Sequence, residues 1–218
     1  MFPDPKSKTG RFGVLFNDIR ECKNAKHCPE LNIRQFYYEP NGFTISFWND
    51  KGLWREGIDH RVVFVCESPG PSAAEGTAED VQPCYHGSHR DRRFQEVRRK
   101  YDFENCFITN TVKCGVRRGA QHSPFEIKAC RGFLLCEIDL IRPQVIVGVG
   151  GNAYRTLRKD ILSHLKMPPI IFKITHYSSR RNPMEYWDKE FPELIRLLDR
   201  LRPWEEWAND RTVWSRNS

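Results

Sequence analysis

The chain has 218 residues, of which 39% are hydrophobic, and a formal net charge of +7. This length suits one large core and is short for two, and no apolar run approaches the ~18 residues that cross a bilayer. The sequence therefore argues against a membrane-spanning or exported protein and predicts one soluble, cytoplasmic domain over residues 1–218, whose basic character mildly favours polyanionic partners.

The first predicted helix follows a loose start at residues 1–10. Apolar residues recur at helical spacing from Phe12 to Ile19, and this helix leads to Cys22. Cys28 follows in a polar loop, where a free thiol has no packing role. The two thiols are therefore either a paired functional feature or two unrelated surface cysteines.

The sequence RVVFVCESPG at residues 61–70 contains the feature around which the rest of the chain is arranged. Its apolar run, from Val62 to Cys66, is typical of a strand buried on both faces, and the run ends at Glu67. The turn that follows exposes this carboxylate in the crevice where open α/β sheets bind their ligands. For this stretch alone, the alternative is an ordinary strand-end acid in solvent.

A basic loop with aromatic rings precedes the next helix, in the sequence PCYHGSHRDRRF at residues 83–94. It leads into a helix predicted from about Asp91 to Lys100. Such a loop suits a phosphate backbone and a stacked ring, although a solvated charged face explains the arginines equally well.

Strands and helices alternate through the rest of the chain, and each predicted strand ends in a polar residue or a glycine turn. Asn110 follows the second strand, Gly150 the third and His176 the fourth. The helix after Asn110 begins with a capping box formed by Ser123 and Glu126 around a proline. The predicted strands are at residues 105–109, 145–149 and 170–174. The predicted helices are at residues 123–141, over about ten residues from 150, and at 184–201. A Trp-rich tail at 203–218 is expected to fold back on the body.

Strands joined by helical crossovers predict an α/β fold with a four-stranded parallel sheet. Because the carboxyl ends of parallel strands meet at one edge, Glu67, Asn110 and His176 are expected to share a pocket. An amide can read the edge of a base, a carboxylate can orient water or stabilise positive charge, and an imidazole can face developing negative charge. A single strand-end histidine is more often structural, but three polar strand ends of different types favour a catalytic set.

Seven of the eight cysteines fall into two groups. One group lies in predicted loops or near the start of a helix, beside Lys or Arg residues that favour the thiolate form. Its members are Cys22, Cys28, Cys114 and Cys130. Most of the others lie in apolar strands or in the long helix, where cysteine packs as a small hydrophobe, whereas Cys84 fits neither group. Four exposed thiols suit a structural zinc ion or a [4Fe–4S] cluster, and their spacing does not distinguish the two.

Several motifs together resemble those of the family 4 uracil-DNA glycosylases. They are CESPG at 66–70, ITNTVKC at 108–114, SPFEIKAC at 123–130 with IRPQVIVGVG behind it, and THYSSRRNP at 175–183. The resemblance implies a three-layer α/β/α sandwich around the four-stranded parallel sheet. It also implies a [4Fe–4S] cluster, although the family's first cysteine pair is usually more closely spaced than the pair in this chain. The implied ligands are Cys22, Cys28, Cys114 and Cys130.

The resemblance also implies roles for residues of the pocket. Glu67 matches the acid that positions or activates the hydrolytic water, Asn110 the asparagine that reads the uracil edge, and His176 the histidine that faces the base O2 as the glycosidic bond breaks. The stacking phenylalanine of the family falls within residues 83–87, where Tyr85 is the best candidate for the ring.

Two parts of the pocket depart from the family pattern. The family usually has Gly before the acid and Ala after it, where this chain has Cys66 and Ser68, and both Ser68 and Gly70 are expected to contact the substrate. The family's last loop usually continues with a proline and an apolar wedge, so duplex insertion here would fall to a tyrosine or an arginine. The residues expected at the DNA backbone or as the wedge are Tyr177, Ser178, Arg180 and Arg181.

His122 follows a short arginine-containing loop. A related glycosylase group carries a histidine in an Arg-rich insert at about this place and becomes covalently attached to the abasic sugar, but the loop here is only loosely similar. We therefore expect an ordinary solvated histidine at position 122.

These features predict a monofunctional, monomeric DNA glycosylase of base-excision repair that flips a base, with uracil as the first expectation, and hydrolyses its N-glycosidic bond. One alternative is a glycosylase of the same fold for another modified base, for example in foreign or phage DNA. The others are a non-catalytic iron–sulfur protein that binds nucleic acid and a nucleotide- or small-molecule-binding domain, the last indicated only by the sequence GVGGN.

Overall fold

The computed structural model describes residues 59–68, 89–113, 122–165, 168–179 and 182–210, and near the start of the chain Arg11, Val14, Leu15, Asp18, Ile19 and Cys22. Several residues of the predicted site lie outside these ranges, so their roles stay predictions. They are Cys28, Gly70, Tyr85, Cys114, Arg180 and Arg181.

Four parallel strands form one sheet in the order β2-β1-β3-β4. Their bounds are Asp59–Cys66 for β1, Cys106–Asn110 for β2, Val145–Val149 for β3 and Ile170–Ile174 for β4. The central strand β1 is fully buried from Val62 to Val65, which explains its continuous apolar run. The predicted four-stranded parallel sheet is confirmed.

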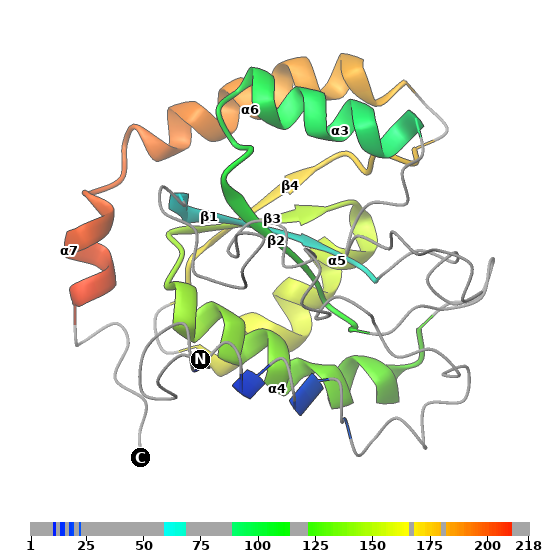
Figure 1. Ribbon diagram of the computed structural model, residues 1–218, viewed down its shortest axis with the longest axis vertical. Helices are drawn as coiled ribbons and strands as arrows, with labels where there is room; N and C mark the ends of the chain where they lie inside the picture. Colours follow the sequence, from blue (N-terminus) through cyan, green and yellow to red (C-terminus); the bar gives the residue numbers. More distant parts are fainter. Residues whose placement is uncertain are drawn as a thin grey trace, which may run out of the picture.

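Helices cover both faces of this sheet (Figure 1). Helices α3 (His89–Lys100) and α6 (Pro183–Leu198) lie on one face, and α4 (Pro124–Ile141) and α5 (Gly151–Thr156) on the other. Alternate residues of β1 divide between the layers. Phe64 packs with Phe94 of α3 and Phe191 of α6, whereas Val63 belongs to the cluster that contains Leu134 of α4. The three-layer α/β/α sandwich is therefore confirmed.

Helix α4 begins and ends as the sequence predicts. The Ser123 hydroxyl accepts the Glu126 backbone N–H at 3.2 Å, and the Glu126 carboxylate accepts the Ser123 N–H at 2.6 Å. The helix ends at Arg142, which adopts the left-handed conformation (φ 58°) before Pro143. No helix within the described part of the chain has both the length and the apolar character that a membrane crossing requires.

The segment after β3 differs from the single ten-residue helix that the sequence predicts. Helix α5 is followed by a π-helical turn at Leu157–Ile161 and a 3-10 turn at Leu162–His164. The widened turn places Leu157 and Ile161 in the core beside α4, so packing decides the local helix geometry here.

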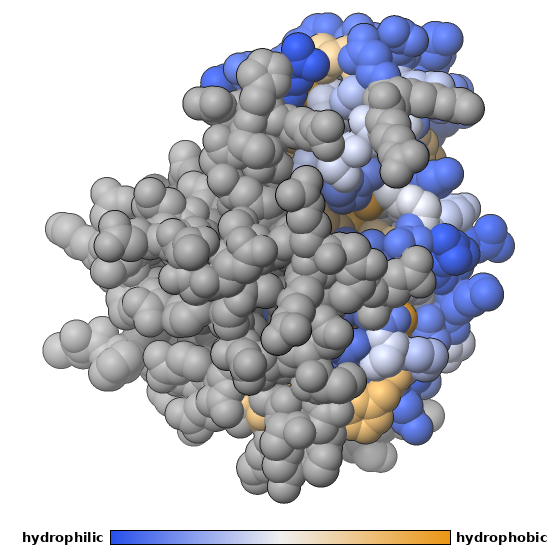
Figure 2. Space-filling view, turned by 90° about the vertical axis from the view of Figure 1, so that its right-hand side faces the viewer, coloured by the Kyte–Doolittle hydropathy of each residue, from blue (hydrophilic) through white to orange (hydrophobic). Residues whose placement is uncertain are grey.

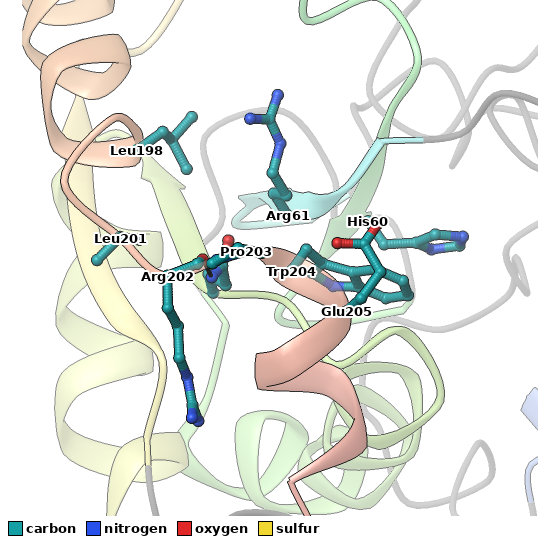
Figure 3. A pocket seen from close by; sticks show the side chains of 9 residues that line it. His60, Arg61, Leu198, Leu201, Arg202, Pro203, Trp204 and Glu205 are labelled. Atoms are coloured by element: carbon teal, nitrogen blue, oxygen red, sulfur yellow. Dashed lines mark hydrogen bonds between the residues drawn. The ribbon is translucent and has the colours of Figure 1, made fainter.

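The start of the tail folds back on the body, as predicted. Helix α7 (Trp204–Asn209) is held by two indole N–H groups, because Trp204 donates to the Arg142 carbonyl and Trp207 to the Pro143 carbonyl, both at 3.1 Å. The Trp204 ring also stacks on His60 of β1, with ring centroids 4.9 Å apart (Figure 3). Residues 211–218 lie outside the described residues.

Candidate active site

A cleft of about 440 Å³ opens at the carboxyl edge of the sheet. Along this edge the strand ends lie in the spatial order Asn110, Glu67, Gly150 and His176, which follows from the strand order, and Asn110 is not among the residues that line the cleft. Seen from the side toward which the strands run, the described surface is mainly hydrophilic (Figure 2). The residues lining the cleft are Glu67, Val149, Gly150, Gly151, Asn152, Lys173, Thr175, His176, Ser178 and Ser179.

Glu67 is held from both sides of its strand. On the β2 side, its backbone carbonyl accepts the Val112 N–H at 2.9 Å and the Thr111 hydroxyl at 2.7 Å. On the other side, the Asn152 side-chain N–H₂ donates to both carboxylate oxygens, at 3.0 and 2.9 Å. The acid predicted from the end of the first strand therefore has a fixed orientation beside the cleft.

His176 presents one defined ring nitrogen for hydrogen-bond donation. Its Nδ1 accepts the backbone N–H of Ser178 at 3.0 Å and lies 2.7 Å from the Ser178 hydroxyl. Because a backbone N–H can only donate, the proton of the neutral ring is on Nε2. The Nε2–H group is the donor with which His176 can stabilise negative charge on a group bound in the cleft.

The loop that carries His176 is tied to α6. The Glu190 carboxylate accepts both the backbone N–H and the hydroxyl of Thr175, each at 2.8 Å, and the Trp187 indole donates to the Thr175 carbonyl at 2.8 Å. These three bonds satisfy every polar group of Thr175, which is the residue before His176. The position of His176 is therefore set by buried parts of the fold.

Gly150 makes room for the His176 ring. It adopts a φ of +90°, and a Cβ added there would lie 2.9 Å from the His176 Cβ and 3.1 Å from its Cδ2. We expect Gly150→Ala to strain the backbone, displace His176 and lower the rate of the reaction at this cleft by about 10²-fold. The measurement is the single-turnover rate of the reaction tested under the proposed function.

Gly132→Ala is the control for that variant, because Gly132 is exposed on α4, does not line the cleft, and a Cβ there meets no atom within 4 Å. It should retain the wild-type rate. An active Gly150→Ala variant would show that the reaction does not need His176 in this place.

Asn110 lies next to Glu67 and is fully buried. Its Cα pairs with that of Cys66 in the sheet, and its carbonyl accepts the Lys113 ammonium at 2.9 Å. Ser68 follows Glu67 and is half-buried. The structure thus brings Glu67, His176 and Ser178 to one cleft, with Asn110 and Ser68 beside residue 67 in the fold.

The expectation that Tyr177 acts as a wedge does not agree with its position. Its side chain is buried among the aromatic residues above the sheet, where it stacks on Phe94 at 5.5 Å and on His176 at 4.2 Å. A wedge must project from the surface to enter a duplex. Tyr177 instead supports the His176 ring, whereas Ser178 is exposed.

The expectation of a solvated histidine at position 122 is wrong. The His122 side chain is only 3% exposed and its Nδ1 lies 3.8 Å from a Glu126 carboxylate oxygen. Burial lowers the pKa of His122, while the negative charges of Glu126 and Glu67 oppose that shift. His122 is therefore a buried, neutral residue at neutral pH.

Two of the four predicted cluster ligands lie in the described residues. Cys130 is buried in α4, and its Sγ accepts the backbone N–H of Lys113 at 3.4 Å. Cys22 is half-buried and follows Leu15 and Ile19, which pack in the same core cluster as α4. A thiolate that accepts a backbone N–H is typical of an iron–sulfur ligand, so Cys130 fits this role.

The Lys113 side chain, which the sequence places beside Cys114, is held by acceptors inside the protein. Its ammonium donates to Glu137 at 2.6 Å, to the Thr109 hydroxyl at 2.6 Å and to the Asn110 carbonyl at 2.9 Å. The positive charge is therefore neutralised inside the protein by Glu137.

Asn152 and its neighbour Arg155 are the site residues that the sequence interpretation missed. Arg155 Nη2 donates to the Asn152 side-chain oxygen at 2.6 Å, and Asn152 in turn donates to Glu67. The available signal was the position of Asn152 three residues after the end of the third strand, in the turn at the same sheet edge as the other polar strand ends.

A second cavity, of about 520 Å³, lies at the opposite edge of the sheet between β1, the end of α6 and α7 (Figure 3). Its walls include His60, Arg61, Leu198, Arg202 and Trp204. None of the site residues predicted from the sequence lines this second cavity. The cleft at the carboxyl edge of the sheet is therefore the candidate active site.

Comparison with known proteins agrees with this architecture. The family model of the Uracil DNA glycosylase superfamily matches residues 55–202. The type-4 uracil-DNA glycosylase of Thermotoga maritima is 34% identical to this chain over 96 residues, which are 44% of this chain and 48% of that protein. The match thus spans about half the length of that relative. Since the family model covers more than half of the sequence, the chain belongs to the Uracil DNA glycosylase superfamily.

Proposed function

We propose that the protein is a monofunctional DNA glycosylase that removes uracil from DNA by hydrolysis. The observation that carries the proposal is that one cleft contains both the oriented Glu67 carboxylate and the Nε2–H donor of His176. Membership of the superfamily and the likeness to a protein named as a type-4 uracil-DNA glycosylase support it.

The chemistry follows from where charge develops. A base must leave the helical stack before its glycosidic bond can be reached. As the bond between the sugar C1′ and the base nitrogen breaks, its electron pair passes to the base, which becomes negative, while the sugar becomes positive. The Nε2–H of His176 donates to the base oxygen, and the Glu67 carboxylate stabilises the sugar and accepts a proton from the water that attacks C1′.

Four cysteines are proposed to hold a [4Fe–4S] cluster, namely Cys22, Cys28, Cys114 and Cys130. When bound, the cluster would cross-link segments of the chain that are far apart in sequence. The hydrogen bond from the Lys113 N–H to the Cys130 sulfur supports this assignment. A monomeric, cytoplasmic repair enzyme remains the expectation from sequence.

The proposal is tested with anaerobically purified full-length protein and a panel of single-stranded and duplex oligonucleotides. One set contains uracil, and the others contain hypoxanthine or modified pyrimidines. Alkaline cleavage at uracil supports the proposal. Cleavage only at another base would keep the chemistry and assign a different substrate. If no strand is cleaved at any base although the protein still binds DNA, the result would favour a non-catalytic nucleic-acid-binding protein.

A further inference from the structure

We infer that Asn152 is a positioning residue for Glu67 and that Arg155 holds Asn152 in the required orientation. The inference rests on the proposed function and concerns the same cleft. Asn152 and Arg155 lie three residues apart on α5, whereas Glu67 follows β1, so the contact joins two segments that are distant in sequence.

Arg155 determines which way the Asn152 amide faces. A guanidinium group has only donors, so the Asn152 atom that it contacts at 2.6 Å must be the amide oxygen. The N–H₂ group of Asn152 then has to face Glu67. Rotating the amide by half a turn would place two donors against each other at Arg155 and two acceptors against each other at Glu67.

The amide nitrogen lies almost equally far from the two carboxylate oxygens, at 3.0 and 2.9 Å. A donor equally far from both oxygens occupies the side of the carboxylate that faces Asn152. The outer lone pairs of both oxygens stay available for water. Asn152 therefore sets the direction from which Glu67 can hold the attacking water.

The start of α5 is itself held close to the sheet. A Cβ added at Gly148 would lie 2.8 Å from the Cα of Tyr154, so the glycine in β3 lets α5 approach its strand. This close packing fixes the distance from α5 to Glu67. Asn152 and Arg155 themselves are exposed, so replacing them should leave the fold intact.

The decisive test compares Asn152→Ala and Asn152→Asp with the wild type. Asp has the same shape and can still pair with Arg155, but it presents an acceptor to the Glu67 carboxylate. We expect the single-turnover excision rate to fall by about tenfold in Asn152→Ala, with unchanged DNA affinity, and by at least about 10²-fold in Asn152→Asp, measured at saturating enzyme. A residue that only supports the structure would give the opposite order, because Asp would preserve the contact with Arg155.

A second pair of variants tests the role of Arg155. Arg155→Met should slow excision several-fold, whereas Arg158→Met removes the same charge from the neighbouring turn and should not, because Arg158 contacts Tyr154 and not Asn152. The thermal midpoint of each variant shows whether the fold is retained.

The outcomes separate this inference from the proposed function. An active wild type together with an Asn152→Asp variant at least as fast as Asn152→Ala would overturn the positioning role and leave the glycosylase proposal standing. A wild type that is inactive on every base in the panel would instead refute the proposed function.

Discussion

Glu67→Gln is expected to lower the rate of uracil excision by about 10³-fold, the middle of the range for loss of a general base. Gln keeps the size of the side chain but has neither the negative charge that stabilises the sugar nor the oxygen that takes the proton from water. In the wild type, the Asn152 N–H₂ group lies about 3.0 Å from both carboxylate oxygens of Glu67. The N–H₂ group of a Gln at position 67 would therefore face another donor. Single-turnover kinetics with enzyme in excess measure this step.

The control for Glu67→Gln is Glu193→Gln, which makes the same change at an exposed position of α6. The control should keep both the wild-type rate and the wild-type DNA affinity. Glu67→Gln should bind DNA at least as well as the wild type, because it removes a negative charge beside the substrate. A Glu67→Gln variant with nearly full activity would exclude Glu67 as the general base.

Lys113→Met is expected to reduce the free energy of unfolding by about 3–5 kcal/mol. Lys113 and Glu137 are 1% and 0% exposed, and the ammonium has three acceptors for its three N–H groups. Removing it leaves the Glu137 carboxylate buried, with the Thr109 hydroxyl as its remaining donor among the contacts described above. Urea denaturation of the full chain measures the change.

Two further variants define the origin of that loss. Lys128→Met removes an exposed lysine from α4, the helix that carries Glu137, and should change the free energy of unfolding by less than about 0.5 kcal/mol. The double variant Lys113→Met/Glu137→Leu removes the buried carboxylate as well and should recover much of the loss. A loss of less than about 1 kcal/mol in Lys113→Met would show that the pair is not closed off from water.

The sequence was sufficient for the sheet and for the position of the acid. Strands such as Val145–Val149 are apolar throughout because both faces of the sheet are covered, and this pattern is visible without a structure. The start of α4 was equally predictable, since the capping box depends on residues three positions apart.

The polar pairs were not predictable because their partners are far apart in sequence. Asn152 contacts a residue 85 positions away, and Lys113 contacts Glu137 at a separation of 24. A local sequence pattern does not predict contacts between residues so far apart in the chain. Tyr177 was misplaced for a related reason: it stands among polar residues in the sequence, but Phe94 of the distant helix α3 packs on it in the fold.

The most direct test of the central claim is to identify what the protein releases from a uracil-containing single strand. Mass spectrometry of the reaction of the wild-type protein should detect free uracil and an uncleaved strand with one abasic site, in equal amounts. Binding of the strand without release of any base would contradict the account, because the carboxylate and the imidazole donor would then occupy the cleft without performing the reaction.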